Sequence, residues 1–137
     1  MTSVGVVGLG DMGSGIAKNL IAHGFETWGR DLIEARHRAF GEMGGHMADS
    51  TAEVGRNAHY VFVMVMKGAE AHEVILGEGG LAETMAPGGT ILLTSTIKPA
   101  EARAIGAGLQ GSGLHLIDSP VSGGYPGAQG GTLTFMA

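Results

Sequence analysis

A glycine-rich turn between an apolar run and a helical pattern constrains this chain more than any other feature. Residues 4–7 form the apolar run, and only Gly5 interrupts it. Residues 8–13 follow with glycines in the spacing G-x-G-x-x-G, and apolar residues over 16–20 then recur at helical intervals. The sequence therefore predicts a strand, a tight glycine turn and a helix from about Met12 to His23, ending at Gly24.

A strand, a glycine turn and a helix in this order form the fingerprint of dinucleotide-binding folds. Gly8 permits the sharp turn out of the strand. Gly10, without a Cβ, allows a pyrophosphate to approach the backbone, and Gly13 allows the helix to pack closely on the strand. The free N–H groups of the helix start then face the phosphates. In a chain with 26 glycines this one match is weak evidence, so the rest of the sequence has to support it.

An acidic residue follows at the distance that this fingerprint requires. Residues 25–30 are a weak second strand, and Asp31 ends it about 20 residues beyond the turn, where NAD-binding folds place an acid on the ribose hydroxyls. Asp31 also suits the N-cap of the next helix, predicted over residues 32–43, and the two roles are compatible. Arg30 suits a 2′-phosphate, but the neighbouring carboxylate repels one. The pair therefore favours NAD over NADP.

Strand and helix patterns alternate along the remaining chain. A capping box at residues 50–53 begins a short helix to about Asn57, and Pro99 suits the first turn of a later helix. Further strands are predicted over residues 60–66, 90–94, 114–117 and 132–136, and further helices over 69–76, 81–85 and from 99. This alternation predicts an α/β fold, a Rossmann-type doubly wound, mainly parallel sheet with helices on both faces. Its ligands bind beyond the carboxyl ends of the strands.

Composition excludes several classes of protein. The 137 residues, 44% of them hydrophobic and 15% charged, suit one folded domain, and the net charge of −5 without a Lys/Arg cluster argues against nucleic-acid or membrane partners. The absence of cysteine removes disulfides and thiolate chemistry. The six histidines lack metal-ligand spacing, so we expect no metal. No apolar run is long enough to span a bilayer, which favours a cytoplasmic protein.

A second glycine-rich stretch covers residues 118–134, DSPVSGGYPGAQGGTLT. Several of its glycines suit tight turns, yet a loop this long in a compact domain is more often functional. Ser122, Gly123 and Gly124 offer a hydroxyl and unobstructed N–H groups. We expect these groups to suit a carboxylate.

Three segments together resemble the β-hydroxyacid dehydrogenases. They are GLGDMGSGIAKNL at 8–20, STIKP at 95–99 and the stretch at 118–134. This family comprises 3-hydroxyisobutyrate, tartronate semialdehyde and L-threonate dehydrogenases and the related 6-phosphogluconate dehydrogenases. The segment WGRDL at 28–32 is most similar to the threonate branch. The resemblance implies an oxidoreductase that transfers a hydride between NAD and a small 3-hydroxy acid.

The resemblance also implies roles by position. Asp31 takes the adenosine ribose, and Thr96 lies by the nicotinamide. Ser122, Gly123 and Gly124 hold the substrate carboxylate. The remaining cofactor-binding residues are Gly8, Leu9, Gly10, Asp11, Met12, Gly13, Met66 and Lys67.

The chain departs from the family in one respect. Nothing in it matches the family's catalytic lysine in its G-x-x-G-x-x-x-K-x-x-N context, and we do not assign that role to Lys18, Lys67 or Lys98. We therefore expect residues 1–137 to be the NAD(P)-binding domain of a longer enzyme, inactive alone, whose C-terminal helical domain carries the lysine and forms a homo-oligomer. The alternative is a stand-alone NAD(H)-binding or sensing module without catalysis.

Overall fold

The computed structural model describes residues 2–95, 97–118, 121–122 and 134–135. Its strands are β1 (Ser3–Val7), β2 (Glu26–Arg30), β3 (His46–Met47), β4 (Tyr60–Val63), β5 (Thr90–Leu93), β6 (His115–Asp118), β7 (Val121–Ser122) and β8 (Thr134–Phe135). Its helices are α1 (Asp11–Ala22), α2 (Glu34–Glu42), α3 (Thr51–Asn57), α4 (Gly68–Leu76), α5 (Leu81–Thr84) and α6 (Pro99–Gly108). The elements alternate as the sequence predicts.

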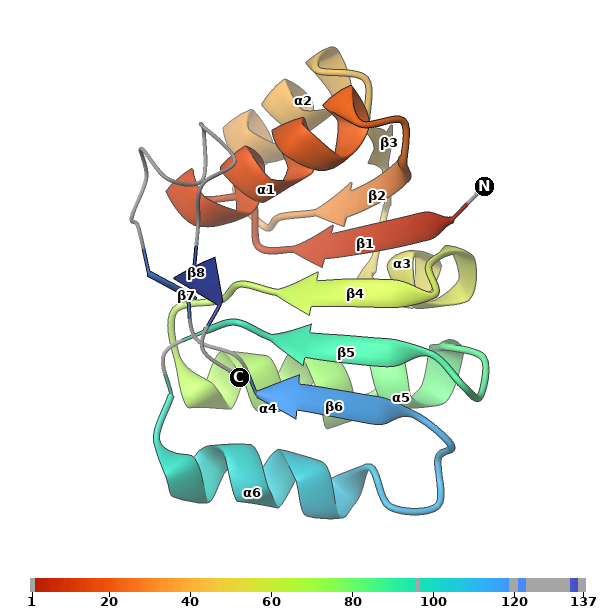
Figure 1. Ribbon diagram of the computed structural model, residues 1–137, viewed down its shortest axis with the longest axis vertical. Helices are drawn as coiled ribbons and strands as arrows, with labels where there is room; N and C mark the ends of the chain where they lie inside the picture. Colours follow the sequence, from red (N-terminus) through yellow and green to blue (C-terminus); the bar gives the residue numbers. More distant parts are fainter. Residues whose placement is uncertain (1, 96, 119–120, 123–133, 136–137) are drawn as a thin grey trace.

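Six parallel strands form one sheet in the order β3-β2-β1-β4-β5-β6 (Figure 1). The chain leaves β1 in one direction to reach β2 and β3, and then crosses over to continue through β4, β5 and β6. The direction reverses between β1 and β4, which makes their carboxyl ends the switch point of a doubly wound sheet. The predicted Rossmann-type α/β fold is confirmed.

Two apolar clusters hold helices to the sheet. One lies between β1 and helices α1 and α2, with Val6, Ile16 and Phe40 at its centre. The larger cluster lies on the other face, where Val61, Val63 and their neighbours in β5 pack against the layer formed by α3 to α6. Residues of one strand contribute to both clusters because successive side chains point to opposite faces.

Local sequence signals set several helix ends. α1 stops at Ala22, and Gly24 follows at φ 87°, a left-handed conformation that favours glycine. Ser50 is the N-cap of α3, and its hydroxyl accepts a hydrogen bond from the N–H of Glu53 at 3.2 Å. The predicted boundaries of both helices are therefore confirmed to within a residue.

Other boundaries differ from prediction. β4 ends at Val63 although the apolar run continues to Met66, because the chain bends away from the sheet there and leaves Met66 86% exposed. α2 starts at Glu34, two residues later than predicted. The two-residue strand β3 was not predicted, since a pair such as His46–Met47 has no periodicity. Within the described residues, the predicted strand 132–136 is the short β8, which pairs with β7.

Candidate functional site

The glycine turn follows β1 at the switch point and is packed too tightly for side chains at two positions. Gly8 adopts φ 99°, and its N–H donates to the carbonyl of Arg30 at 3.0 Å. A Cβ on Gly8 would overlap the carbonyl of Met64 at the end of β4, and one on Gly13 would overlap the carbonyl of Gly8. The first turn of α1 is thereby held directly against the end of β1, as the fingerprint predicts.

Gly10 differs from these two glycines because its missing side chain leaves open space. The nearest atoms to a Cβ built there belong to the guanidinium of Arg36, at 3.5 and 3.8 Å. Gly10 is the N-cap of α1 and supplies no side-chain hydrogen bond to the helix start. The turn therefore combines an open backbone, the positive end of a helix dipole and a nearby cation, which together suit a phosphate.

Asp31 lies directly after β2 and joins the turn to the next helix. One carboxylate oxygen accepts the N–H of Leu9 at 2.7 Å, and the other accepts the N–H of Ile33 at 2.7 Å. Ile33 rather than Asp31 is the N-cap of α2, so the capping alternative is wrong in detail: Asp31 closes the turn before the helix. A carboxylate has about four acceptor positions, so two donors leave it capacity for ribose hydroxyls.

The ends of β4 and β5 are fixed to each other by hydroxyl groups. Ser95, only 4% exposed, donates to the carbonyl of Val63 at 3.1 Å and accepts the N–H of Val65 at 2.9 Å. Thr94, also buried, donates to the same carbonyl at 3.0 Å. These bonds position the segment before Met66 and Lys67, which are both exposed at the carboxyl edge of the sheet.

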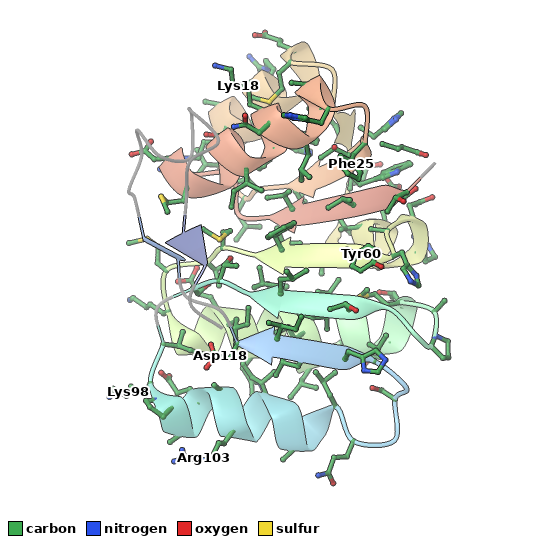
Figure 2. The ribbon with its side chains drawn as sticks, viewed as in Figure 1. Lys18, Phe25, Tyr60, Lys98, Arg103 and Asp118 are labelled. Carbon is green, nitrogen blue, oxygen red and sulfur yellow. The ribbon has the colours of Figure 1, made fainter. Side chains whose placement is uncertain are left out.

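The remaining predicted residues are less completely described. Thr96, Gly123 and Gly124 lie outside the described residues. Ser122 is in β7, opposite Thr134 of β8. Asp118 ends β6 and is exposed near the start of α6, on the same edge of the sheet as the glycine turn (Figures 1 and 2).

The structure thus gathers Gly8, Gly10, Gly13 and Asp31 around the switch point, with Asp11 and Met12 in the first turn of α1 and Leu9 buried at 2% exposure. Two residues join them that the sequence pattern does not single out. Arg36 could have been noticed only from its place on the first turns of α2, and Ser95 only from its position at a strand end. Both follow from the fold rather than from a motif.

Two other kinds of site were sought in the described part of the chain. No group of three or more histidine, aspartate or glutamate side chains there is arranged to hold a metal ion. None of the helices in the described ranges has both the length and the apolarity needed to cross a membrane.

Comparison with known proteins supports a dinucleotide site at this turn. Residues 3–137 match the model of the NAD binding domain of 6-phosphogluconate dehydrogenase. L-threonate dehydrogenase of Escherichia coli K12 is 37% identical over 135 residues, which are 98% of this chain and 45% of that protein. Mitochondrial 3-hydroxyisobutyrate dehydrogenase of Mus musculus is 36% identical, with 98% and 40% covered. The chain therefore spans less than half the length of these relatives.

Solved structures agree with this relationship. A 3-hydroxyisobutyrate dehydrogenase from Salmonella typhimurium superposes with a TM-score of 0.92 at 34% identity, covering 99% of this chain and 47% of that one. The resemblance to the β-hydroxyacid dehydrogenases is thus confirmed. Because the family model matches almost the whole length, this chain belongs to the family of the NAD binding domain of 6-phosphogluconate dehydrogenase.

Proposed function

We propose that this chain is the cofactor-binding part of an oxidoreductase that transfers a hydride between NAD and a small 3-hydroxy acid. The observation that carries the proposal is the geometry of Asp31, whose carboxylate is held by the N–H groups of Leu9 and Ile33 beside the glycine turn. That placement leaves the carboxylate oriented by two rigid donors. It suits the paired hydroxyls of an adenosine ribose.

The other residues of the edge have separable roles in this proposal. The open backbone at Gly10 and the helix start at Asp11, Met12 and Gly13 hold the pyrophosphate, with Arg36 as an added cation. Met66, Lys67 and Thr96 border the nicotinamide half. NAD, when bound, supplies or accepts the hydride, while the protein fixes its orientation.

Asp31 also determines the preferred cofactor. NADP carries a phosphate on the ribose oxygen that Asp31 would bind, and a fixed carboxylate repels that phosphate. One similar structure, 29% identical with a TM-score of 0.87, was solved with NADP+, so the fold accommodates both cofactors. We therefore propose NAD as the cofactor of this chain.

The substrate class rests on the relatives. Those with the most similar sequences are L-threonate and 3-hydroxyisobutyrate dehydrogenases. A Mycobacterium tuberculosis 3-hydroxyisobutyrate dehydrogenase, 29% identical with a TM-score of 0.92, was solved with L-serine, a compound with a carboxylate and a 3-hydroxyl. For this chain we propose that Ser122, Gly123 and Gly124 hold such a carboxylate.

The described residues do not provide an evident group for moving the hydroxyl proton. Lys67 and Lys98 are exposed, and Lys18 lies on α1. We propose that the proton-transfer group, and the contacts of a homo-oligomer, come from the part of the relatives' length that this chain does not span. Residues 1–137 are then expected to bind NAD without turnover of a 3-hydroxy acid.

Calorimetric titration with NAD and NADP tests the cofactor assignment. Asp31→Asn keeps the size of the side chain but removes its charge, and we expect it to weaken NAD binding and to reduce the preference for NAD over NADP. Asp118→Asn is the matched control at the same edge of the sheet and should change neither. Equal affinity for NAD and NADP in the unmodified chain, unaltered by Asp31→Asn, would falsify the assignment.

A further inference from the structure

The two faces of strands β4, β5 and β6 are covered very differently. On the face packed against α3 to α6, Val61, Val63, Ile91 and Leu93 are fully buried. On the opposite face the register aligns a row of Val6, Phe62, Leu92 and Ile117. Exposure rises along this row, from 0% at Val6 under α1 to 41% at Ile117 at the sheet edge.

A second row on the same face shows the same trend. The register aligns Val4 of β1 with Tyr60, Thr90 and His115. Val4 is 4% exposed, whereas Tyr60 is 40% exposed. Figure 1 shows α1 and α2 in front of β1 and β2, and among the described residues no helix lies in front of β4, β5 and β6. We call the side chains of Tyr60, Phe62, Leu92 and Ile117 the open face.

The open face follows from the handedness of the crossovers. Right-handed crossovers place α1 and α2 on one side of the sheet, because the chain moves from β1 toward β3. They place α3 to α6 on the other side, because the chain then moves from β3 to β6. No crossover within this strand order can therefore cover the open face, so its cover has to come from outside β1 to β6.

The dimensions of the open face match those of one helix. Three neighbouring strands spaced about 4.8 Å apart span roughly 10 Å, and a helix with its side chains is about 10–12 Å across. The layer of α1 and α2 already stands beside this space on the same side of the sheet. A single helix next to α1 would complete that layer and bury the apolar row.

We propose that the open face is the docking site for an apolar helix from the part of the protein that corresponds to the second half of its relatives. The length of those relatives supports this occupant: the matched region is 45% of the E. coli L-threonate dehydrogenase, so more than half of that protein lies outside it. The inference holds whichever hydroxy acid is the substrate. It also links the cofactor domain to the remainder of the enzyme through an apolar contact away from the glycine turn.

Single cysteines test this docking directly, because the chain has none of its own. Ile117→Cys reports on the open face. Arg103→Cys is the control, on an exposed position of α6 (Figure 2). The rate of thiol labelling is measured in residues 1–137 and in a fusion with the second half of E. coli L-threonate dehydrogenase attached after Ala137. We expect labelling of Ile117→Cys to be about tenfold slower in the fusion, and that of Arg103→Cys to be unchanged.

A second measurement does not depend on the fusion. The second half of the E. coli enzyme is coexpressed as a separate chain with residues 1–137, and co-purification is measured. Ile117→Lys should abolish co-purification, and Arg103→Ala should not. Equal labelling of Ile117→Cys in both chains, together with co-purification that is absent or insensitive to Ile117→Lys, overturns the proposal. So does protection in residues 1–137 alone that is lost on dilution, since a second copy would then be the occupant.

Discussion

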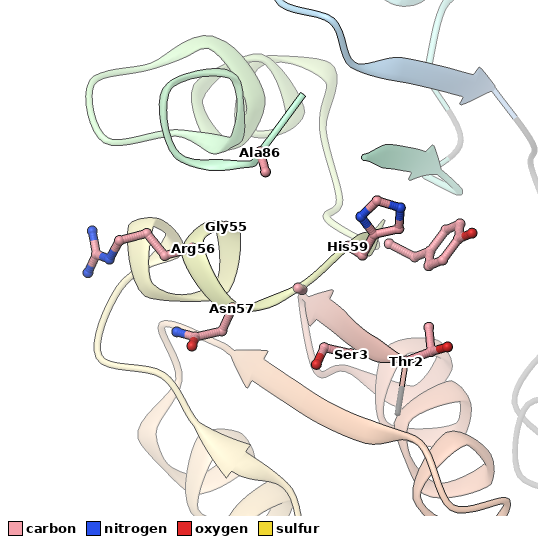
Figure 3. Close-up of a pocket in the computed structure, with 9 residues that line it drawn as sticks. Thr2, Ser3, Gly55, Arg56, Asn57, His59 and Ala86 are labelled. Carbon is pink, nitrogen blue, oxygen red and sulfur yellow. The ribbon is translucent and has the colours of Figure 1, made fainter. Parts of the chain in front are cut away.

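The two edges of the parallel sheet can be compared in this molecule, since each has a feature that resembles a binding site. The carboxyl edge has the glycine turn, which contains little empty space at Gly8 and Gly13. The amino edge has a hollow of about 410 Å³ where α3 ends and β1 and β4 begin (Figure 3). Its lining residues are Thr2, Ser3, Gly55, Arg56, Asn57, Ala58, His59, Tyr60 and Ala86.

Electrostatics separates the two edges more clearly than shape. α1, α4 and α6 begin at the carboxyl edge, so their N–H groups and positive dipole ends face it. α3 ends at Asn57 beside the hollow, where its carbonyl groups carry partial negative charge. A dinucleotide with two phosphates is favoured at the first edge and disfavoured at the second. Concavity alone is therefore a poor guide to the site.

The largest expected effect is at the carboxyl edge. Gly13→Ala places a Cβ against the carbonyl of Gly8, and we expect it to lower the free energy of unfolding by about 1–3 kcal/mol and to abolish measurable NAD binding. Gly106→Ala is the control, because its Cβ would lie 3.8 Å from Leu116 in ordinary contact. It should stabilise α6 by up to about 1 kcal/mol. Thermal unfolding and NAD titration measure both, and normal NAD binding by Gly13→Ala would contradict the close packing.

A pair of serines gives the next largest effect, one at each edge. Ser95→Ala leaves the N–H of Val65 without its partner at a buried position, which should cost about 1–3 kcal/mol and weaken NAD binding. Ser112 makes the same kind of bridge before β6, accepting the N–H of Leu114 at 3.1 Å, but is only half-buried. Ser112→Ala should cost about 0.5–1 kcal/mol and leave NAD binding unchanged. Chemical denaturation with parallel titration distinguishes them, and equal effects on NAD binding would remove the distinction between the edges.

A smaller effect is expected at Arg36, whose guanidinium lies beside Gly10. Arg36→Ala should weaken NAD binding about fivefold, equivalent to about 1 kcal/mol, and the loss should shrink at high salt. Arg38→Ala removes the same charge from α2, where Arg38 pairs with Glu34 at 2.7 Å, and should have no effect on binding. Titrations at two salt concentrations provide the test. A similar loss for both variants would indicate a general charge effect instead of a phosphate contact.

The smallest effect is expected at the amino edge. Arg56→Ala changes a residue that lines the hollow and again removes one positive charge. We expect NAD affinity to stay within about twofold of the unmodified chain, because the charge is at the opposite end of the strands. If Arg56→Ala weakened NAD binding as much as Arg36→Ala, the hollow would have to be included in the site.

The sequence was informative where local chemistry fixes the backbone. Gly24 and Ser50 mark helix ends, and the glycine turn and Asp31 have the predicted positions along the fold. It was less informative where the tertiary structure decides. Met66 continues an apolar run but is exposed, because the fold rather than hydrophobicity ends β4. The contact of Arg36 with the turn depends on how α2 packs, and no spacing in the sequence encodes that angle.

The two backbone hydrogen bonds of Asp31 have a consequence for engineering. Attempts to convert an NAD-dependent protein to NADP commonly begin by replacing the acid at the ribose. Here that acid is also the acceptor for Leu9 and Ile33, so its removal would loosen the phosphate-binding turn while it removes the repulsion. A successful conversion would need a replacement such as Asn or Ser that still accepts the N–H of Leu9. Cofactor choice and turn rigidity are thus a single trait in this fold, and selection on either one would act on both.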